Sequence, residues 1–234
     1  MKKSIAILAL VASLVSFESI GQTIVHFPDR TFTRENGLNK ANDYEDPNII
    51  GSKYIFSVYQ PAKLSTHENV LFNVRYNAYN DDIEIQGKEE NTSYALNKYS
   101  GTIIVSLLSG QNYINTKYVD SKNNSKTGFF QILNTNSNFY LLKKQTIILT
   151  DKIEAKTTYH KSKPAKYTQS KDQYFIKKDN NTATEIPTNN KKFAGLFPDQ
   201  KKEVLSFIKE EKIKLKKEDD LKKIFNFIKK MQKN

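Results

Sequence analysis

Apolar and polar residues alternate over much of the chain between Gly51 and Leu149. This pattern is clearest in "NVLFNVRYNAY" (69–79), where every second side chain is apolar: Val70, Phe72, Val74, Tyr76 and Ala78. A period of two predicts a β-strand with one face in the core and the other in solvent. Comparable segments, separated by turns rich in Asn, Asp, Ser and Gly, predict further strands at 53–60, 82–86, 93–98, 102–109, 112–119, 128–133, 138–150 and 173–178.

Short strands that follow one another through such turns are typical of antiparallel sheets rather than of parallel βαβ units. We therefore expect an α+β fold that is mainly β, with an antiparallel meander or a curved sheet of the half-barrel kind over residues 51–178. Residues 22–50 are polar and predict an irregular N-terminal segment, and residues 179–192 predict a linker or a loop.

The periodicity changes in the last part of the chain, residues 193–234. Two segments there carry an apolar stripe at helical spacing, with acids near their starts and lysines near their ends, as the helix dipole favours. The stripes consist of Val204, Leu205, Phe207 and Ile208, and of Leu221, Ile224, Phe225 and Ile228. They predict a helical hairpin that packs on the sheet. The alternatives are an element that docks a partner and a helix that lies on a membrane surface.

The first 21 residues have the pattern of a secretory signal peptide. Two lysines precede the apolar run "IAILALVASLVSF", and "ESIG" supplies small residues at a cleavage site after Gly21. We therefore expect an exported protein. Because the chain has no cysteine, it carries neither a disulfide nor a lipid-modified cysteine, and its core must hold the fold. No later segment is long and apolar enough to predict a transmembrane helix.

The positive charge of the chain is concentrated near its end. The whole chain has a formal net charge of +12, and residues 191–234 hold 14 lysines and seven acids. A basic exported tail favours anionic partners such as lipopolysaccharide, phospholipid headgroups or acidic glycans, whereas export separates the protein from nucleic acid. The plainer interpretation, which we prefer, is a solvated helical face rich in lysine.

The stretch "VRYNAYNDDIEI" (74–85) contains the candidate site, a polar surface row of Arg75, Asn77, Asp82 and Glu84. A two-residue turn at Asn80 and Asp81 predicts a hairpin in which Asn77 pairs with Glu84 and Tyr76 with Ile85. Arg75 and Glu84 would then form an exposed ion pair on the wet face. This interpretation explains the row as hairpin structure without a ligand.

Catalytic and metal-binding motifs are absent from the sequence. His26, His67 and His160 lie far apart, and there is no HExxH, CxxC, GxSxG or glycine-rich phosphate loop. Asp81, Asp82 and Glu84 could supply ligands to Ca²⁺, but the intervening apolar residues and the lack of a loop glycine disfavour this. Asp82 and Glu84 could also act as a glycosidase pair, but that chemistry needs one carboxyl whose pKa is raised by burial, and this face is expected to be wet. We expect no catalytic residues, cofactor or metal.

Several stretches together resemble one family. "GSKYIFSVYQPAKL", "NVRYNAYNDDIEI", "GFFQILNTNSNFYLLKK" and "LFPDQKKEVLSFIKEEKIKLKKEDDLKKI" resemble an uncharacterised family of exported, signal-peptide-bearing Bacteroidetes proteins. Its members have a YNxYxDE-type hairpin and a lysine-rich helical C-terminus. The resemblance implies the periplasm or the outer-membrane surface of a Gram-negative bacterium, and it brings no activity with it.

The function that these observations favour is that of a non-catalytic exported envelope protein that binds a protein partner or a cell-surface component. An alternative is a periplasmic carrier of an apolar or lipid ligand, held between a curved sheet and its helices. A hydrolase of envelope glycans is a further alternative. The sequence leaves the partner and the oligomeric state open.

Overall fold

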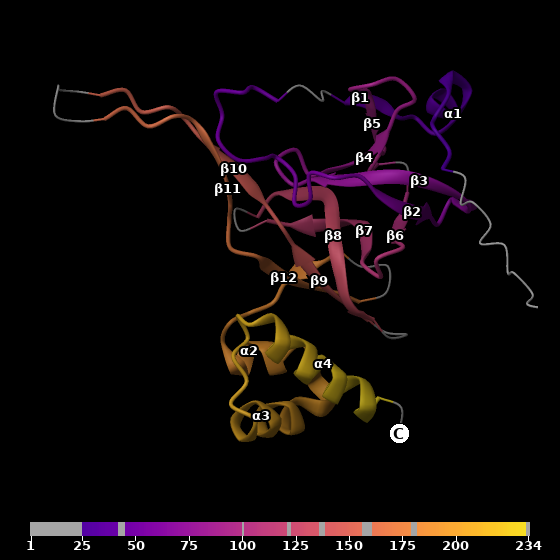
Figure 1. Cartoon of the computed structure of the whole chain (residues 1–234). Helices are drawn as coiled ribbons and strands as arrows, with labels where there is room; N and C mark the ends of the chain where they lie inside the picture. Colours follow the sequence, from indigo (N-terminus) through magenta and orange to yellow (C-terminus); the bar gives the residue numbers. More distant parts are fainter. Residues whose placement is uncertain are drawn as a thin grey trace, which may run out of the picture.

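An open antiparallel sheet of eleven strands forms the body of the protein in the computed structural model (Figure 1). The structure describes residues 25–41, 45–99, 101–120, 123–135, 139–155, 161–178 and 182–232. The predicted signal peptide, residues 1–21, lies outside the described residues. The strand order across the sheet is β1 (Asn39–Ala41), β5 (Ser93–Ala95), β4 (Asp82–Gln86), β3 (His67–Asn77), β2 (Gln60–Leu64), β6 (Ile104–Leu107), β7 (Asn112–Val119), β8 (Ser125–Thr135), β9 (Phe139–Lys144), β12 (Gln173–Lys178) and β13 (Thr184–Glu185).

Most neighbours in this sheet are also neighbours in sequence, as in a meander. A separate pair, β10 (Ile147–Thr150) and β11 (Lys166–Gln169), leaves the sheet as a two-stranded ribbon and projects from the body in Figure 1. The predicted fold class, mainly β with helices at the C-terminus, is confirmed.

The period-two pattern of 69–79 is visible in the burial of β3. Phe72, Val74 and Tyr76 are buried in a core with Ile83 and Ile85 of the neighbouring strand β4. Each of these side chains contributes about 1.5–3 kcal/mol through removal of its apolar surface from water. The apolar faces of β2, β6 and β7 continue the same core, through residues such as Leu64, Val105 and Tyr113.

The expected strand at 53–60 is wrong. Gly51 to Tyr59 form bends, and the strand β2 begins only at Gln60 and includes Pro61. Residues 51–59 instead lie against the end of β3, where Tyr54 forms an isolated bridge with Asn77 and the Ile55 amide donates to the Tyr76 carbonyl at 3.2 Å. The Tyr54 hydroxyl reaches Glu84 on β4. Alternation alone cannot distinguish this covering segment from a strand.

Three other expectations need correction. The segment 22–50 is not wholly irregular, since it contains the helix α1 (Arg30–Glu35), capped by Asp29, and the edge strand β1. The segment 179–192 contains β13 and the start of the helix α2 (Asn190–Ala194). The single strand expected at 138–150 is two strands: β9 pairs with β8 and β12, whereas β10 pairs with β11 in the ribbon.

The C-terminal helices cover the end of the sheet near β9 and β12 (Figure 1). They are α2, a 3-10 turn η1 (Pro198–Gln200), α3 (Lys201–Glu210) and α4 (Glu218–Met231). Both apolar stripes contribute to one core, in which Val204, Ile208, Leu221, Ile224, Phe225 and Ile228 pack with Phe139, Leu141 and Ile176 of the sheet. The buried stripes therefore leave little apolar surface for a membrane. No helix among the described residues is long and apolar enough to span a bilayer.

Phe225 provides a test of this packing. Its ring is fully buried and lies 5.0 Å from the ring of Phe139 on β9. We expect Phe225→Ala to lower the free energy of unfolding by about 3–5 kcal/mol, because it removes a large buried ring and leaves a cavity. Chemical denaturation measures this change.

The matched control is Phe227→Ala, on the same helix. Phe227 is only partly buried, and its ring stacks on that of Phe207 at a centroid distance of 4.1 Å. We therefore expect Phe227→Ala to lower the free energy of unfolding by clearly less than Phe225→Ala. Equal losses for the two variants would show that the helices are not anchored to the sheet through Phe225.

Candidate functional site

The polar row of the β3–β4 hairpin is covered by protein rather than exposed to solvent. Asn77 is 0% and Glu84 is 1% exposed, so the predicted surface row is wrong for these two residues. The covering segment is the one that was expected to be a strand, and it brings Tyr54 and Tyr59 over the hairpin. The row is therefore buried at Asn77 and Glu84 and partly buried at Arg75 and Asp82.

Glu84 is the centre of this network. One carboxylate oxygen accepts hydrogen bonds from the Tyr54 hydroxyl at 3.1 Å and from Nε and Nη2 of Arg75, both at 3.1 Å. The other oxygen accepts from Asn77 Nδ2 at 2.8 Å. The Arg75 guanidinium lies between two rings, 3.8 Å from the Tyr54 centroid and 4.3 Å from the Tyr59 centroid. Stacking and paired hydrogen bonds offset the desolvation of both charges.

The register of the hairpin also differs from the prediction. Arg75 lies directly opposite Glu84, and Asn77 lies opposite Asp82, so the connection runs from Ala78 to Asp81 rather than through two residues. The reason is tertiary, because the Ala78 amide donates to the Lys53 carbonyl at 3.0 Å and so leaves the ladder. Asp81 has a φ of 58°, in the left-handed region expected for a turn residue.

The two carboxylates considered for glycoside hydrolysis each face a cation. Asp82 pairs with Lys98 at 2.8 Å, and Glu84 pairs with Arg75 at 3.1 Å. Each carboxylate is therefore engaged in an ion pair with a residue of the fold. The described residues contain no group of three or more His, Asp or Glu residues placed to hold a metal ion.

Asp81 connects the tip of the hairpin to β8 and β9. Its carboxylate accepts hydrogen bonds from the Tyr76 hydroxyl at 2.8 Å and from the Phe129 amide at 3.1 Å, and it pairs with the ammonium of Lys144. Burial lowers the pKa of Lys144, and the Asp81 charge acts in the opposite direction. Burial, followed by Asp81, raises the pKa of Tyr76 well above its ordinary value.

The close approach of these groups requires a glycine in β8. A methyl group on Gly128 would lie 2.1 Å from the Asp81 carboxylate and 2.7 Å from Lys144 Nζ. Any larger residue there would push apart a buried ion pair, so Gly128 is part of the same network.

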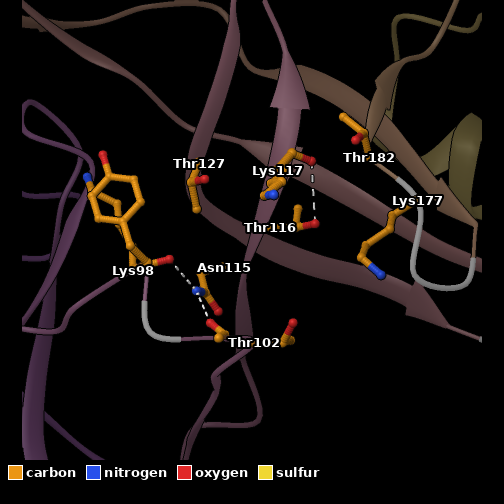
Figure 2. A pocket seen from close by; sticks show the side chains of 10 residues that line it. Lys98, Thr102, Asn115, Thr116, Lys117, Thr127, Lys177 and Thr182 are labelled. Carbon is orange, nitrogen blue, oxygen red and sulfur yellow. Dashed lines mark hydrogen bonds between the residues drawn. The ribbon is translucent and has the colours of Figure 1, made fainter.

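A cleft lined by lysine and threonine lies next to this network (Figure 2). It has a volume of about 350 Å³, and its described lining is Lys98, Tyr99, Gly101, Thr102, Asn115, Thr116, Lys117, Thr127, Lys177 and Thr182. In Figure 2, Lys98 and Lys177 lie on opposite sides, with Lys117 and Thr116 between them. The lining thus combines three lysines and four threonines, and no carboxylate is among its described residues.

Buried polar contacts hold the walls of this cleft. Asn115 on β7 donates to the Lys98 and Gly101 carbonyls at 2.8 and 2.6 Å and accepts from the Ile103 amide, which holds Lys98, Gly101 and Ile103 against β7 (Figure 2). On the other side, the Ala183 amide donates to the Lys117 carbonyl at 2.8 Å. Lys98 Nζ donates to the Asp81 carbonyl at 2.8 Å, which joins the cleft to the hairpin tip.

A second hollow of about 520 Å³ adjoins the first and shares Lys98, Tyr99, Lys117 and Thr127 with it. It adds Asp81, and also Lys126, whose ammonium pairs with Asp120 at 2.8 Å. Tyr99 is 76% exposed although it lines both hollows. The two together form one basic groove with an exposed aromatic ring in its middle, which we call the lysine cleft.

The lysine cleft was missed by the sequence analysis. Its lysines come from a loop, from β7 and from β12, and lysine is frequent throughout the chain. Only the pairing of β7 with β8 and the return of the chain from β12 to β7 bring them together. The alternation of apolar and polar residues within "NYINTKYV" predicts a strand, but it does not indicate which lysines line the same cleft.

The buried pair can be tested by Glu84→Gln. Loss of the carboxylate charge breaks the buried ion pair between Glu84 and Arg75, so we expect the free energy of unfolding to fall by about 3–5 kcal/mol. Asp82→Asn is the matched control on the same strand; its pair with Lys98 is more exposed and should cost less than about 1 kcal/mol. Similar values for both in urea denaturation would contradict the buried network.

Gly128→Ala tests the contact between β8 and the hairpin tip. We expect a loss of about 1–3 kcal/mol in unfolding free energy, because the methyl group forces the ends of the Asp81 and Lys144 side chains to shift. In the Asp81→Ala background the same methyl group meets no carboxylate and should cost much less. A double-mutant cycle with no coupling between the two positions would refute the close approach.

Comparison of the chain with protein-family models, with curated proteins and with solved structures found no match. Membership of the family that the sequence resembles therefore stays a prediction. The functional argument depends on the geometry of the lysine cleft itself.

Proposed function

We propose that the protein is a non-catalytic, exported binding protein of the cell envelope that recognises an anionic cell-surface component through the lysine cleft. The observation that carries this proposal is the lining of the inner hollow of the cleft, which has three lysines and four threonines and no carboxylate among its described residues. Lysine ammonium groups and threonine hydroxyls are hydrogen-bond donors suited to phosphate or carboxylate oxygens.

The construction of the cleft supports the same proposal. Lys177 is only 7% exposed, and its ammonium lies 5.6 Å from the centroid of the Tyr140 ring, so it is held rather than free to sample solvent. Asn115 fixes the opposite wall through three hydrogen bonds. A cavity of this kind, largely formed before binding, needs little ordering when an anion enters.

The lysine-rich C-terminal helices are the competing anion-binding surface. Their apolar stripes are buried, and several of their charges are paired, as in the bond from Lys222 to Glu218 and the bond from Lys223 to Glu211. Exposed, scattered lysines attract anions over a Debye length, but they do not converge on one ligand. This contrast favours the cleft as the specific site.

The experiment is co-sedimentation with purified Gram-negative outer-membrane vesicles. We expect the double variant Lys117→Gln/Lys177→Gln to bind about tenfold less tightly or worse, because a hydrogen bond to a charged group contributes about 1.5–3 kcal/mol. The matched control is Lys201→Gln/Lys202→Gln, which removes the same charge from the exposed start of α3.

Thermal unfolding of both variants establishes that each is folded at the temperature of the assay. Equal binding by the two variants, or an equal loss in both, would contradict recognition through the cleft. The proposal is supported if the wild-type protein and the α3 variant bind the vesicles and the cleft variant does not.

A further inference from the structure

We infer that the anion recognised in the lysine cleft is carried on a sugar, so that the ligand class is an acidic saccharide such as a sugar phosphate or a uronic acid. This inference rests on the proposed function and adds the identity of the ligand to it. The feature that carries it is Tyr99, which is 76% exposed and lines both hollows of the cleft.

Among the large hydrophobic residues that the structure describes, Tyr99 is the most exposed, and it lines a cleft that is otherwise polar. The Tyr99 amide donates to Asn97 Oδ1 at 3.0 Å, so the backbone that carries the ring is fixed. The adjacent Lys98 is bound to Asp82 and to the Asp81 carbonyl, both at 2.8 Å. Tyr99 is thus presented at the cleft by a braced loop.

The face of a tyrosine ring is a flat apolar surface with partial negative charge. The C–H bonds on one face of a pyranose ring are weakly positive and form a matching flat surface, whereas a free inorganic anion has no such face. The same cleft supplies ammonium groups from Lys117 and Lys177 for the acidic substituent and threonine hydroxyls for ring hydroxyls. Ring and anion would therefore be recognised by different walls of one cleft.

The size of the cleft agrees with a sugar unit. The inner hollow of about 350 Å³ is at the lower end of ligand pockets, which run from about 300 to 1,000 Å³. The adjoining hollow of about 520 Å³ continues past Tyr99 toward Lys126. The outer hollow contains Asp81, and its Lys126 is paired with Asp120, so the acidic substituent is expected in the inner hollow.

The test is isothermal titration calorimetry of the purified protein with three probes: glucose 6-phosphate, glucose and inorganic phosphate. We expect glucose 6-phosphate to bind more tightly than either of the others. Tyr99→Ala should weaken the binding of glucose 6-phosphate about fivefold or more, as the loss of an aromatic ring does where a nucleic-acid base stacks on it. Tyr99→Phe keeps the ring and should keep most of the affinity. Phe56→Ala, which removes another exposed aromatic ring outside the cleft, should have no effect.

The outcomes separate this inference from the proposed function. If inorganic phosphate binds as tightly as glucose 6-phosphate and Tyr99→Ala changes nothing, the saccharide inference is overturned while anion binding at the cleft stands. If no anionic probe binds and the Lys117→Gln/Lys177→Gln variant sediments with vesicles normally, both are overturned.

The acidic sugar could belong to a lipid or to a free glycan. The chemistry recognised is the same, so the two sources are compared by using vesicles that contain lipopolysaccharide and the core oligosaccharide released from it. If Tyr99→Ala weakens binding of the vesicles and of the released oligosaccharide equally, recognition of the sugar itself is supported. If the substitution weakens binding of neither, recognition of the sugar is contradicted.

Discussion

The carboxylate of Asp81 is the contact on which the arrangement of the site depends. It lies at the tip of the β3–β4 hairpin and binds Lys144 of β9, the Phe129 amide of β8 and the Tyr76 hydroxyl, so it joins strands that are far apart in sequence. A buried ammonium is costly unless it is paired, and the pKa of Lys144 is lowered by that burial. The pairing is therefore a constraint that holds the hairpin tip over β8, at the position where Gly128 leaves room for both side chains.

From this contact the lysine cleft follows in steps. With the tip fixed, the Asp81 carbonyl and the Asp82 carboxylate are both placed to bind Lys98. Asn115 of β7 binds the carbonyls of Lys98 and Gly101, and these residues line one side of the cleft. The opposite wall is set by the return of the chain from β12 to the Lys117 backbone. A network beneath the surface thus positions the donors above it, as a preformed binding site requires.

The sequence predicted what depends on local periodicity and missed what depends on distant partners. The strands β4, β7 and β12 were found with their observed bounds, because alternating burial leaves its signal within each segment. The helical stripes, including Phe225, were found for the same reason. The predicted hairpin register was wrong because the Ala78 amide donates to the Lys53 carbonyl and not to the neighbouring strand. Glu84 was predicted to be exposed because the segment that contains Tyr54, which covers it, was predicted to be a strand of the sheet. The cleft could not be predicted, since its lysines converge only after the strands pair.

The most direct test of this account is to locate the bound anion on the folded protein. Chemical-shift mapping by NMR of isotope-labelled protein, titrated with glucose 6-phosphate, reports every residue whose environment changes. The account predicts changes that cluster at Tyr99, Lys117, Thr127 and Lys177, with the lysines of α3 and α4 unaffected. Changes confined to the C-terminal helices, or spread evenly over the exposed lysines, would contradict it.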